Sequence, residues 1–205
     1  MEGKAVRGAS VWGIGVLAAA LLPAAVGHAA MDRQSAVTLD VYGALASYDG
    51  LDEDLSGGGL RVEGAPGPLL LRLEGEMLRG QDTDVEARRA AGGIGVFEPW
   101  TEHTGVVAEL GARHLNPDES SSLTDYSLEF GLRGWTAGAK AGGGFFRGDL
   151  RGVVLYPEDS DRSSQAGGRL EFSGAPDDFQ YLSLLIRGEV LSDEYHAAIG
   201  IRGRF

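Results

Sequence analysis

The sequence predicts an all-β fold, a closed antiparallel up-and-down barrel of about ten strands. Three observations predict it. Beyond the first 30 residues, apolar and polar residues alternate along successive segments, which is the side-chain period of a β-strand. The polar faces of these segments are rich in Arg, Asp and Glu, and long acidic connections alternate with short turns that contain Pro, Gly or Asp. Because a barrel in a bilayer has an apolar outer side, a polar lumen and this loop asymmetry, the predicted class is a transmembrane β-barrel.

The N-terminal 30 residues are set apart from this pattern. They have a basic start, an apolar stretch and small residues at the end, as a secretory signal peptide does. Lys4 and Arg7 form the basic start, and residues 11–26 form the apolar stretch. Cleavage is expected after either Ala29 or Ala30. We therefore assign residues 1–30 to a signal peptide and residues 31–205 to the barrel domain, with an N-terminal anchor helix as the alternative.

The ten predicted strands follow one another with no helical segment between them. In chain order they cover residues 37–48, 60–65, 69–79, 87–97, 103–115, 124–135, 145–156, 168–173, 180–191 and 195–205. The second and eighth are shorter than the roughly 9–11 residues that a tilted spanning strand needs, so each has to extend into neighbouring glycines. If one of these hairpins is absent, the count falls to eight. A soluble β-sandwich is the alternative to a barrel.

The connections predict how the barrel is oriented. Those after the first, third, fifth and seventh strands are long and acidic, covering residues 49–59, 80–86, 116–122 and 157–165. In outer-membrane barrels the longer loops face the outside and the short turns face the periplasm. We expect the C-terminus on the periplasmic side and an acidic rim on the outer side. We interpret this rim as a solvated surface, with a dedicated Ca²⁺ site as the alternative.

Charged residues of both signs recur on the strand faces expected to point inward. The predicted ion-pair network of the lumen is Arg72, Glu74, Glu76, Arg89, Glu109, Arg113, Glu129, Arg133, Arg147, Asp149, Arg151, Arg169, Glu171, Arg187, Glu189 and Arg202. Asp40, Arg61, Glu63, Asp125 and Arg204 have the same predicted orientation, which gives 11 arginines and 10 acids. Unpaired charges in a narrow lumen would cost several kcal/mol each, so near balance predicts a self-neutralising, largely closed interior.

The full chain nevertheless carries a formal net charge of −12, and the excess acids fall in the predicted outer loops. Such acidity disfavours nucleic acid as a partner. There is no cysteine, which excludes disulfides and attachment through a lipoprotein cysteine.

Aromatic residues mark the predicted strand ends. Trp100 and Trp135 fall at the periplasmic ends and Tyr156 at an outer end, as expected for the aromatic girdles of a membrane barrel. The last strand alternates regularly and ends on an aromatic residue. Its apolar residues Tyr195, Ile199, Ile201 and Phe205 are predicted to form the C-terminal signal read by the barrel-assembly machinery.

The sequence contains no motif that predicts a catalytic centre, a cofactor site or a metal site. His196 is the one residue considered for catalysis, because it is expected to point inward near the outer mouth, with Glu189, Ser192 and Asp193 close in sequence. A polar residue at an acidic rim is the simpler interpretation.

Three pieces, in this order, carry a resemblance to a known family. They are Ala46-Ser-Tyr-Asp-Gly50 with the acidic loop to Gly57-Gly-Gly-Leu60 and the turn Gly67-Pro-Leu69; Gln81-Asp-Thr-Asp84 leading to Ala90-Ala-Gly-Gly-Ile-Gly-Val96; and Leu115 to Ser127 followed by Glu129-Phe-Gly-Leu-Arg133. Over roughly residues 44–135 the chain resembles the YfaZ-type family of proteobacterial outer-membrane proteins. The resemblance implies an outer-membrane barrel and brings no catalytic residues.

Together these features predict a small bacterial outer-membrane barrel with a structural or interaction role. Its expected partners are outer-membrane lipids, lipopolysaccharide and, during insertion, the barrel-assembly machinery, and we expect a monomer. The alternatives are a narrow channel for small solutes or ions, an outer-membrane lipid-modifying enzyme built around His196, and adhesion through the outer loops.

Overall fold

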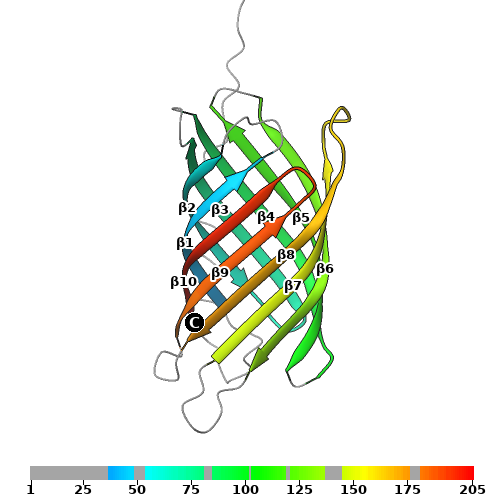
Figure 1. Ribbon diagram of the computed structural model, residues 1–205. Coiled ribbons are helices and arrows are strands. Elements are labelled where there is room, and N and C mark those ends of the chain that lie inside the picture. The colour runs from blue at the N-terminus through cyan, green and yellow to red at the C-terminus, as the bar shows by residue number, and fades with distance from the viewer. Residues whose placement is uncertain are drawn as a thin grey trace, which may run out of the picture.

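The computed structural model describes residues 37–48, 54–80, 85–101, 103–118, 121–136, 145–175 and 181–205. The predicted signal peptide lies outside these ranges, as do six of the predicted loop acids: Asp49, Asp52, Glu53, Asp82, Asp84 and Glu119. Ten antiparallel strands form one closed barrel in which each strand pairs with its sequence neighbours (Figure 1). The strands are β1 (Val37–Ser47), β2 (Leu55–Gly64), β3 (Leu69–Gly80), β4 (Glu86–Pro99), β5 (Thr104–Pro117), β6 (Leu123–Thr136), β7 (Phe145–Pro157), β8 (Gln165–Ala175), β9 (Leu182–Val190) and β10 (Tyr195–Arg204).

The barrel closes between the first and last strands. β1 pairs with β10 over ten residue pairs, from Thr38 opposite Arg204 to Ser47 opposite Tyr195. Val37 and Phe205 extend this seam by exchanging two backbone hydrogen bonds of 3.2 and 2.9 Å. We call the end of the barrel at Phe205 the lower end, and the end with the β7–β8 connection the upper end (Figure 1). The predicted fold class and the count of ten strands are confirmed.

The two segments predicted to be too short both reach spanning length. β2 begins at Leu55 and β8 at Gln165, so each takes in glycines that precede the alternating segment. A side chain on the first of these glycines would not fit, because a Cβ at Gly57 would lie 2.0 Å from the Met77 carbonyl oxygen. Glycine therefore allows β2 to approach β3 closely and to continue as a paired strand.

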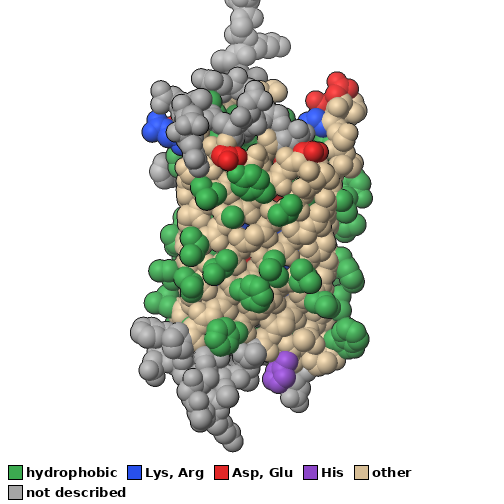
Figure 2. All heavy atoms as spheres, in the orientation of Figure 1, with side chains coloured by type: hydrophobic (Ala, Val, Ile, Leu, Met, Phe, Trp, Pro, Cys, Tyr) green, Lys and Arg blue, Asp and Glu red, His purple; other side chains and the backbone are tan. Residues whose placement is uncertain are grey.

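The wall of the barrel has an inverted distribution of polarity. Large apolar side chains project outward over its whole height and are about half exposed or more (Figure 2). They include Val41, Leu60, Met77, Ile94, Leu110, Phe130, Leu150, Phe172, Leu184, Ile186, Ile199 and Ile201. Charged side chains on the alternate positions point inward and are buried. No helix within the described ranges has the length and hydropathy to cross a bilayer.

Apolar side chains occupy both ends of the interior. At the lower end Phe97 is buried with Ala65, Leu70 and Val107, and its ring centroid lies 5.7 Å from that of Trp135. Trp135 therefore packs inside the barrel, and its prediction as a girdle residue was wrong. The physical reason is strand parity, since Trp135 lies two residues from the inward-facing Arg133 on β6.

The upper interior is lined by a larger apolar cluster of inward-facing residues from β1 to β5 and β10. Its members are Tyr42, Ala44, Ala46, Tyr48, Leu55, Leu78, Ala87, Leu115 and Ala198. Tyr48, which follows β1, is only 4% exposed and belongs to this cluster. Apolar layers thus lie above and below the charged middle of the lumen.

Candidate functional site: an ion-paired barrel interior

Within the described ranges, 11 arginines and 11 acids of the interior are joined to one another by ion pairs. The arginines are 61, 72, 89, 113, 133, 147, 151, 162, 169, 187 and 202. The acids are Asp40, Glu63, Glu74, Glu76, Glu109, Asp125, Glu129, Asp149, Glu171, Glu189 and Glu194. Every residue of the predicted network is among them. These side chains balance one another in charge, which lowers the cost of burying them. Arg204, also expected inside, is partly buried at the end of β10 and has an interaction outside this set.

Glu129 on β6 is the centre of the network. Its side chain has an exposed fraction of 1%, and its carboxylate lies 2.8 Å from Arg72, 3.0 Å from Arg151 and 2.8 Å from Arg169. Glu109 bridges two of the same arginines, at 2.9 Å from Arg72 and 2.7 Å from Arg151. These residues come from β3, β5, β6, β7 and β8, so the cluster extends across the lumen from one side of the barrel to the other.

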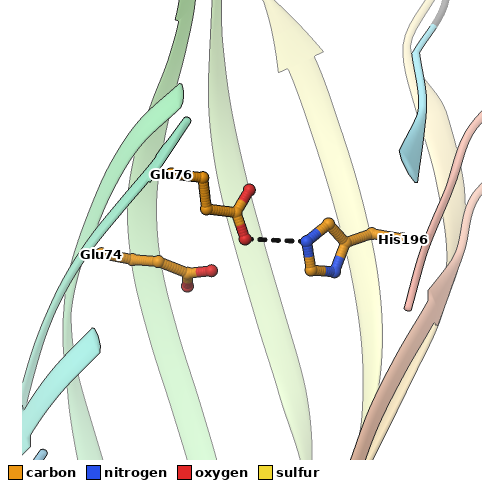
Figure 3. Close-up of side chains that lie close together, drawn as sticks. All are labelled: Glu74, Glu76 and His196. Atoms are coloured by element: carbon orange, nitrogen blue, oxygen red, sulfur yellow. Dashed lines mark hydrogen bonds and ion pairs between the residues drawn. The ribbon is translucent and has the colours of Figure 1, made fainter. Parts of the chain in front are cut away.

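A second cluster lies nearer the upper end, where Glu74 and Glu76 of β3 face His196 of β10 (Figure 3). Nε2 of His196 lies 2.8 Å from Oε1 of Glu76. The Tyr42 hydroxyl donates to both carboxylates, at 2.7 Å to Glu74 and 2.9 Å to Glu76. The guanidinium of Arg187 lies 4.8 Å from the centroid of the Tyr42 ring, a cation–π contact.

This second cluster has donor types that metal ions prefer, since Glu74, Glu76 and His196 each offer a ligand atom within 4.8 Å of the others. All four carboxylate oxygens are already used. Arg89 contacts one oxygen of each glutamate at 2.9 and 3.1 Å, and Arg187 contacts both oxygens of Glu74 at 2.6 and 3.1 Å. A divalent ion would have to displace two buried arginines, so the arrangement fits an ion-pair cluster better than a metal centre.

Two further clusters fill the lower lumen. In one, Arg61 and Arg202 each contact both Asp40 and Glu171, at 2.6 to 2.7 Å. The arginines and acids of this cluster come from β1, β2, β8 and β10, and so connect both sides of the closing seam.

The other lower cluster forms a closed ring of two arginines and two acids. Arg133 and Arg147 both contact Glu63, at 3.1 and 2.7 Å, and both contact Asp149, at 2.8 and 3.1 Å. Glu63 lies on β2 while the other three lie on β6 and β7, so this ring also crosses the lumen.

The upper mouth of the lumen is closed by residues that the sequence did not place there. Glu194, predicted on the acidic rim, is buried and accepts hydrogen bonds from Arg113 at 2.8 Å and Gln165 at 3.1 Å. Arg162, from the β7–β8 connection, donates to Asp125 at 2.8 Å. Glu194 has the inward parity of His196, two residues further along, so extending the alternation beyond the strand would have located it. Arg162 lies in a connection, where alternation gives no information.

A small pocket lies beneath this mouth. It is lined by Tyr48, Arg89, Arg113, Glu189, Leu191, Glu194, Tyr195 and His196. The Tyr48 hydroxyl is buried without a hydrogen-bond partner, and burial raises the pKa of this phenol, so Tyr48 stays neutral. The pocket is bounded by the closing residues of the network and does not continue through the lumen as a described cavity.

The structure does not assemble the constellation considered for catalysis. His196 faces inward, as predicted, but its partner is Glu76. Ser192 is exposed, and its hydroxyl exchanges hydrogen bonds with the backbone of Ala166, at 3.3 and 3.4 Å. His196 and Ser192 therefore point to different partners.

The remaining predicted site residues lie on the outer surface. Trp100 is 73% exposed beside the β4–β5 turn, and Tyr156 is 49% exposed near the upper end of β7. The four residues of the predicted assembly signal share the outward face of the last strand: Tyr195, Ile199, Ile201 and Phe205. Their exposure is compatible with an aromatic girdle and with an assembly signal, and both roles stay predictions.

Comparisons with solved structures return other barrels. They include the KdgM porin in complex with disordered oligogalacturonate (8% identity, TM-score 0.40, covering 82% of this chain and 99% of that chain). They also include the translocator domain of the autotransporter NalP from Neisseria meningitidis (10% identity, TM-score 0.41, 93% and 96%) and an anion-selective porin from Comamonas acidovorans (12% identity, TM-score 0.33, 79% and 58%). At these values the similarities carry no argument about function.

No protein-family model and no curated protein matches the chain. The resemblance to the YfaZ-type family therefore stays a prediction.

Proposed function

We propose that this protein is a small outer-membrane β-barrel whose lumen is closed at rest, with a structural or interaction role at the envelope surface rather than a role in diffusion. The observation that carries the proposal is the inverted polarity of the barrel, with charges buried in the lumen and large apolar side chains exposed outside. An apolar surface of this extent is unfavourable in water and favourable in lipid.

The side chains on the outer wall support a position within a bilayer. Tyr126 and Tyr156 are cross-strand neighbours on the wall near the upper end, and both are about half exposed. Trp100, Tyr181 and Phe205 are exposed near the lower end. Tyr and Trp at two levels, with Phe130, Phe172 and aliphatic residues between them, are typical of the two interfaces of a membrane. With the predicted signal peptide, this supports an outer-membrane location and a periplasmic lower end.

The contents of the lumen support a closed state. Ten strands enclose little more than the space that side chains fill, and here four charged clusters cross that space. Apolar layers lie above and below them. A solute would have to separate buried ion pairs. Leaving one charge of such a pair buried without its partner costs several kcal/mol of stability.

Two measurements test the proposal. The first is fractionation of cells that express the full chain, with boiled and unboiled outer-membrane samples compared on a denaturing gel. We expect the protein in the outer membrane and a mobility shift on boiling, because a closed barrel resists detergent. A protein recovered as a soluble periplasmic species with no shift would refute the membrane location.

The second measurement is conductance in planar bilayers, with a wide porin as the positive control for insertion. We expect the wild-type protein to be silent. The variant Arg72→Ser/Glu129→Ser removes one cation and one anion from the central cluster, keeps the lumen neutral and shortens two cross-lumen side chains, so small current steps are expected from it. Discrete steps from the wild type, equal to those of the variant, would instead favour the narrow channel.

A further inference from the structure

Arginine 88 is an exception among the arginines of the described barrel. Eleven others form the interior network, Arg79 contacts Glu86 at 3.6 Å, and Arg204 has an interaction of its own. Arg88 is exposed on the outer face of β4, and none of the described acids forms an ion pair with it. An exposed cation at the edge of an apolar wall, with no ion pair to the acids of the described ranges, can bind an anion from the surroundings.

The neighbours of Arg88 form a small polar group at the upper rim of the wall. Across the two adjacent strands Arg88 lies opposite Met77 on β3 and Asn116 on β5. Arg79 and His114 are its diagonal neighbours, at a spacing of roughly 7–8 Å for such pairs.

Arg88 and His114 have nitrogen atoms that can contact a ligand, and Arg79, which contacts Glu86, adds positive charge beside them. Arg88 and Arg79 present planar guanidinium groups, which bind phosphate oxygens in pairs. His114 uses Nδ1 in a 3.0 Å contact with the Thr124 hydroxyl, which leaves Nε2 directed elsewhere. Two rim acids within the described ranges, Glu86 and Asp118, lie on the loop side of Arg88, where Asp118 donates its backbone N–H to the Glu86 carbonyl at 2.8 Å.

The wall below Arg88 carries mostly small side chains. The outward positions beneath it on β3, β4 and β5 include four small residues, Gly75, Ala90, Gly92 and Ala112, with Leu73 packed beside Gly92 and His114 beside Ala90. A Cβ at Gly75 would meet no atom within 4 Å, so the surface there is recessed relative to the Leu and Ile side chains lower down. Acyl chains can lie against such a surface while the headgroup stays at the level of the arginine.

We propose that Arg88, with Arg79, Asn116 and His114, binds the phosphate of a phosphorylated glycolipid of the outer leaflet, whose acyl chains lie on the recessed wall beneath. This inference rests on the proposed function, because it needs the upper end to face outward. The glycolipid is favoured over a two-chain phospholipid because the recess extends over three strands and because the cations lie at the rim of the outer leaflet.

Binding is tested with the purified barrel in detergent micelles, with diphosphorylated lipid A as the probe and the bound fraction read by native mass spectrometry. We expect Arg88→Gln to weaken binding by about tenfold, which corresponds to about 1.4 kcal/mol. Arg88→Lys keeps the charge but loses the planar guanidinium, so an intermediate loss of affinity is expected.

Arg162→Gln is the matched control. It also removes one positive charge near the upper end, but from inside the mouth of the lumen, so its affinity for lipid A should equal that of the wild type. Glu86→Gln removes a rim acid and should strengthen binding.

Equal affinity of Arg88→Gln and Arg162→Gln would overturn the site. An equally strong and Arg88-dependent affinity for phosphatidylglycerol would overturn the choice of glycolipid.

The orientation of the barrel in the membrane is measured in a separate experiment. Because the chain has no cysteine, Ser160→Cys in the β7–β8 connection gives a single label, which should react with an impermeant maleimide on intact cells. Absence of that label in a heat-modifiable protein would refute the outward upper end, whereas loss of the micelle result alone would refute only the lipid site.

Discussion

Replacing Glu129 by Gln tests whether the interior network stabilises the barrel as a connected unit. The change keeps the size of the side chain and one acceptor oxygen, but it removes the negative charge that three arginines share. Those contacts measure 2.8, 3.0 and 2.8 Å, to Arg72, Arg151 and Arg169. Since Glu109 is the other acid of this cluster, its two acids and three arginines change from a formal charge of +1 to +2 in a buried site.

The expected loss of stability is large. Removing one partner of a buried ion pair costs about 3–5 kcal/mol, against about 0.5–1.5 kcal/mol for a typical neutral hydrogen bond. With a urea m-value of about 2 kcal/mol/M, the unfolding midpoint should fall by roughly 1.5–2.5 M. The m-value itself should stay unchanged, because the same surface is exposed on unfolding.

The assay is reversible urea unfolding of the barrel in short-chain lipid vesicles, followed by tryptophan fluorescence and by the heat-modifiable gel shift. Glu158→Gln is the control, since this exposed acid lies in the β7–β8 connection and its loss should change the free energy of unfolding by no more than about 0.5 kcal/mol. Adding Arg72→Met to Glu129→Gln restores the original balance of charge and should recover part of the stability. A midpoint for Glu129→Gln equal to that of the control would refute the reasoning and would mean that water solvates the centre of the lumen.

Three further changes test other parts of the structure. Tyr42→Phe removes a hydroxyl that donates at 2.7 and 2.9 Å to the two upper glutamates and should cost about 1–3 kcal/mol in the same unfolding assay, whereas Tyr181→Phe, at a 75% exposed residue, should cost almost nothing. Gly167→Ala places a Cβ 1.9 Å from a carbonyl oxygen of β9 and should reduce the heat-modifiable fraction, whereas Gly188→Ala meets no atom within 4 Å and should fold normally. Arg162→Ala removes the contact that holds the β7–β8 connection over the mouth, so cleavage there by a glutamate-specific protease should be faster than in the wild type. An unchanged cleavage rate would show that this arginine does not anchor the connection.

The alternation of residue types predicted the wall and the lumen well because one physical rule governs both. Successive side chains on a strand point to opposite faces, so a charge at Glu129 and an apolar residue at Phe130 suffice to orient β6. The same rule explains why Glu109, Arg169 and Arg187 were correctly expected inside. Ten strands followed from the same alternation once glycines were allowed to lengthen the two short strands.

The pairing of these charges could not be predicted in this way. Arg187 contacts Glu74, which is 113 residues away in the sequence, and that contact depends on how the closed sheet brings β9 to face β3. Parity along one strand says which side a residue occupies but not what lies across the lumen. Trp135 shows a different limit. An aromatic residue at a strand end favours a girdle position, but the parity of β6 points its side chain into the barrel.

The seam between β1 and β10 also governs the timing of assembly. The last strand of the chain pairs with the first, and the same two strands bring Arg202 to within 2.7 Å of Asp40. Until the final residues have been synthesised and delivered, Asp40 and Glu171 lack one of their two arginines, and the oxygens that Arg202 contacts must remain hydrated. Closing the seam and drying the lower lumen are therefore one event. A partly assembled sheet would be wet on its concave side up to that moment, and a block to closure would leave an open, hydrated groove in the membrane.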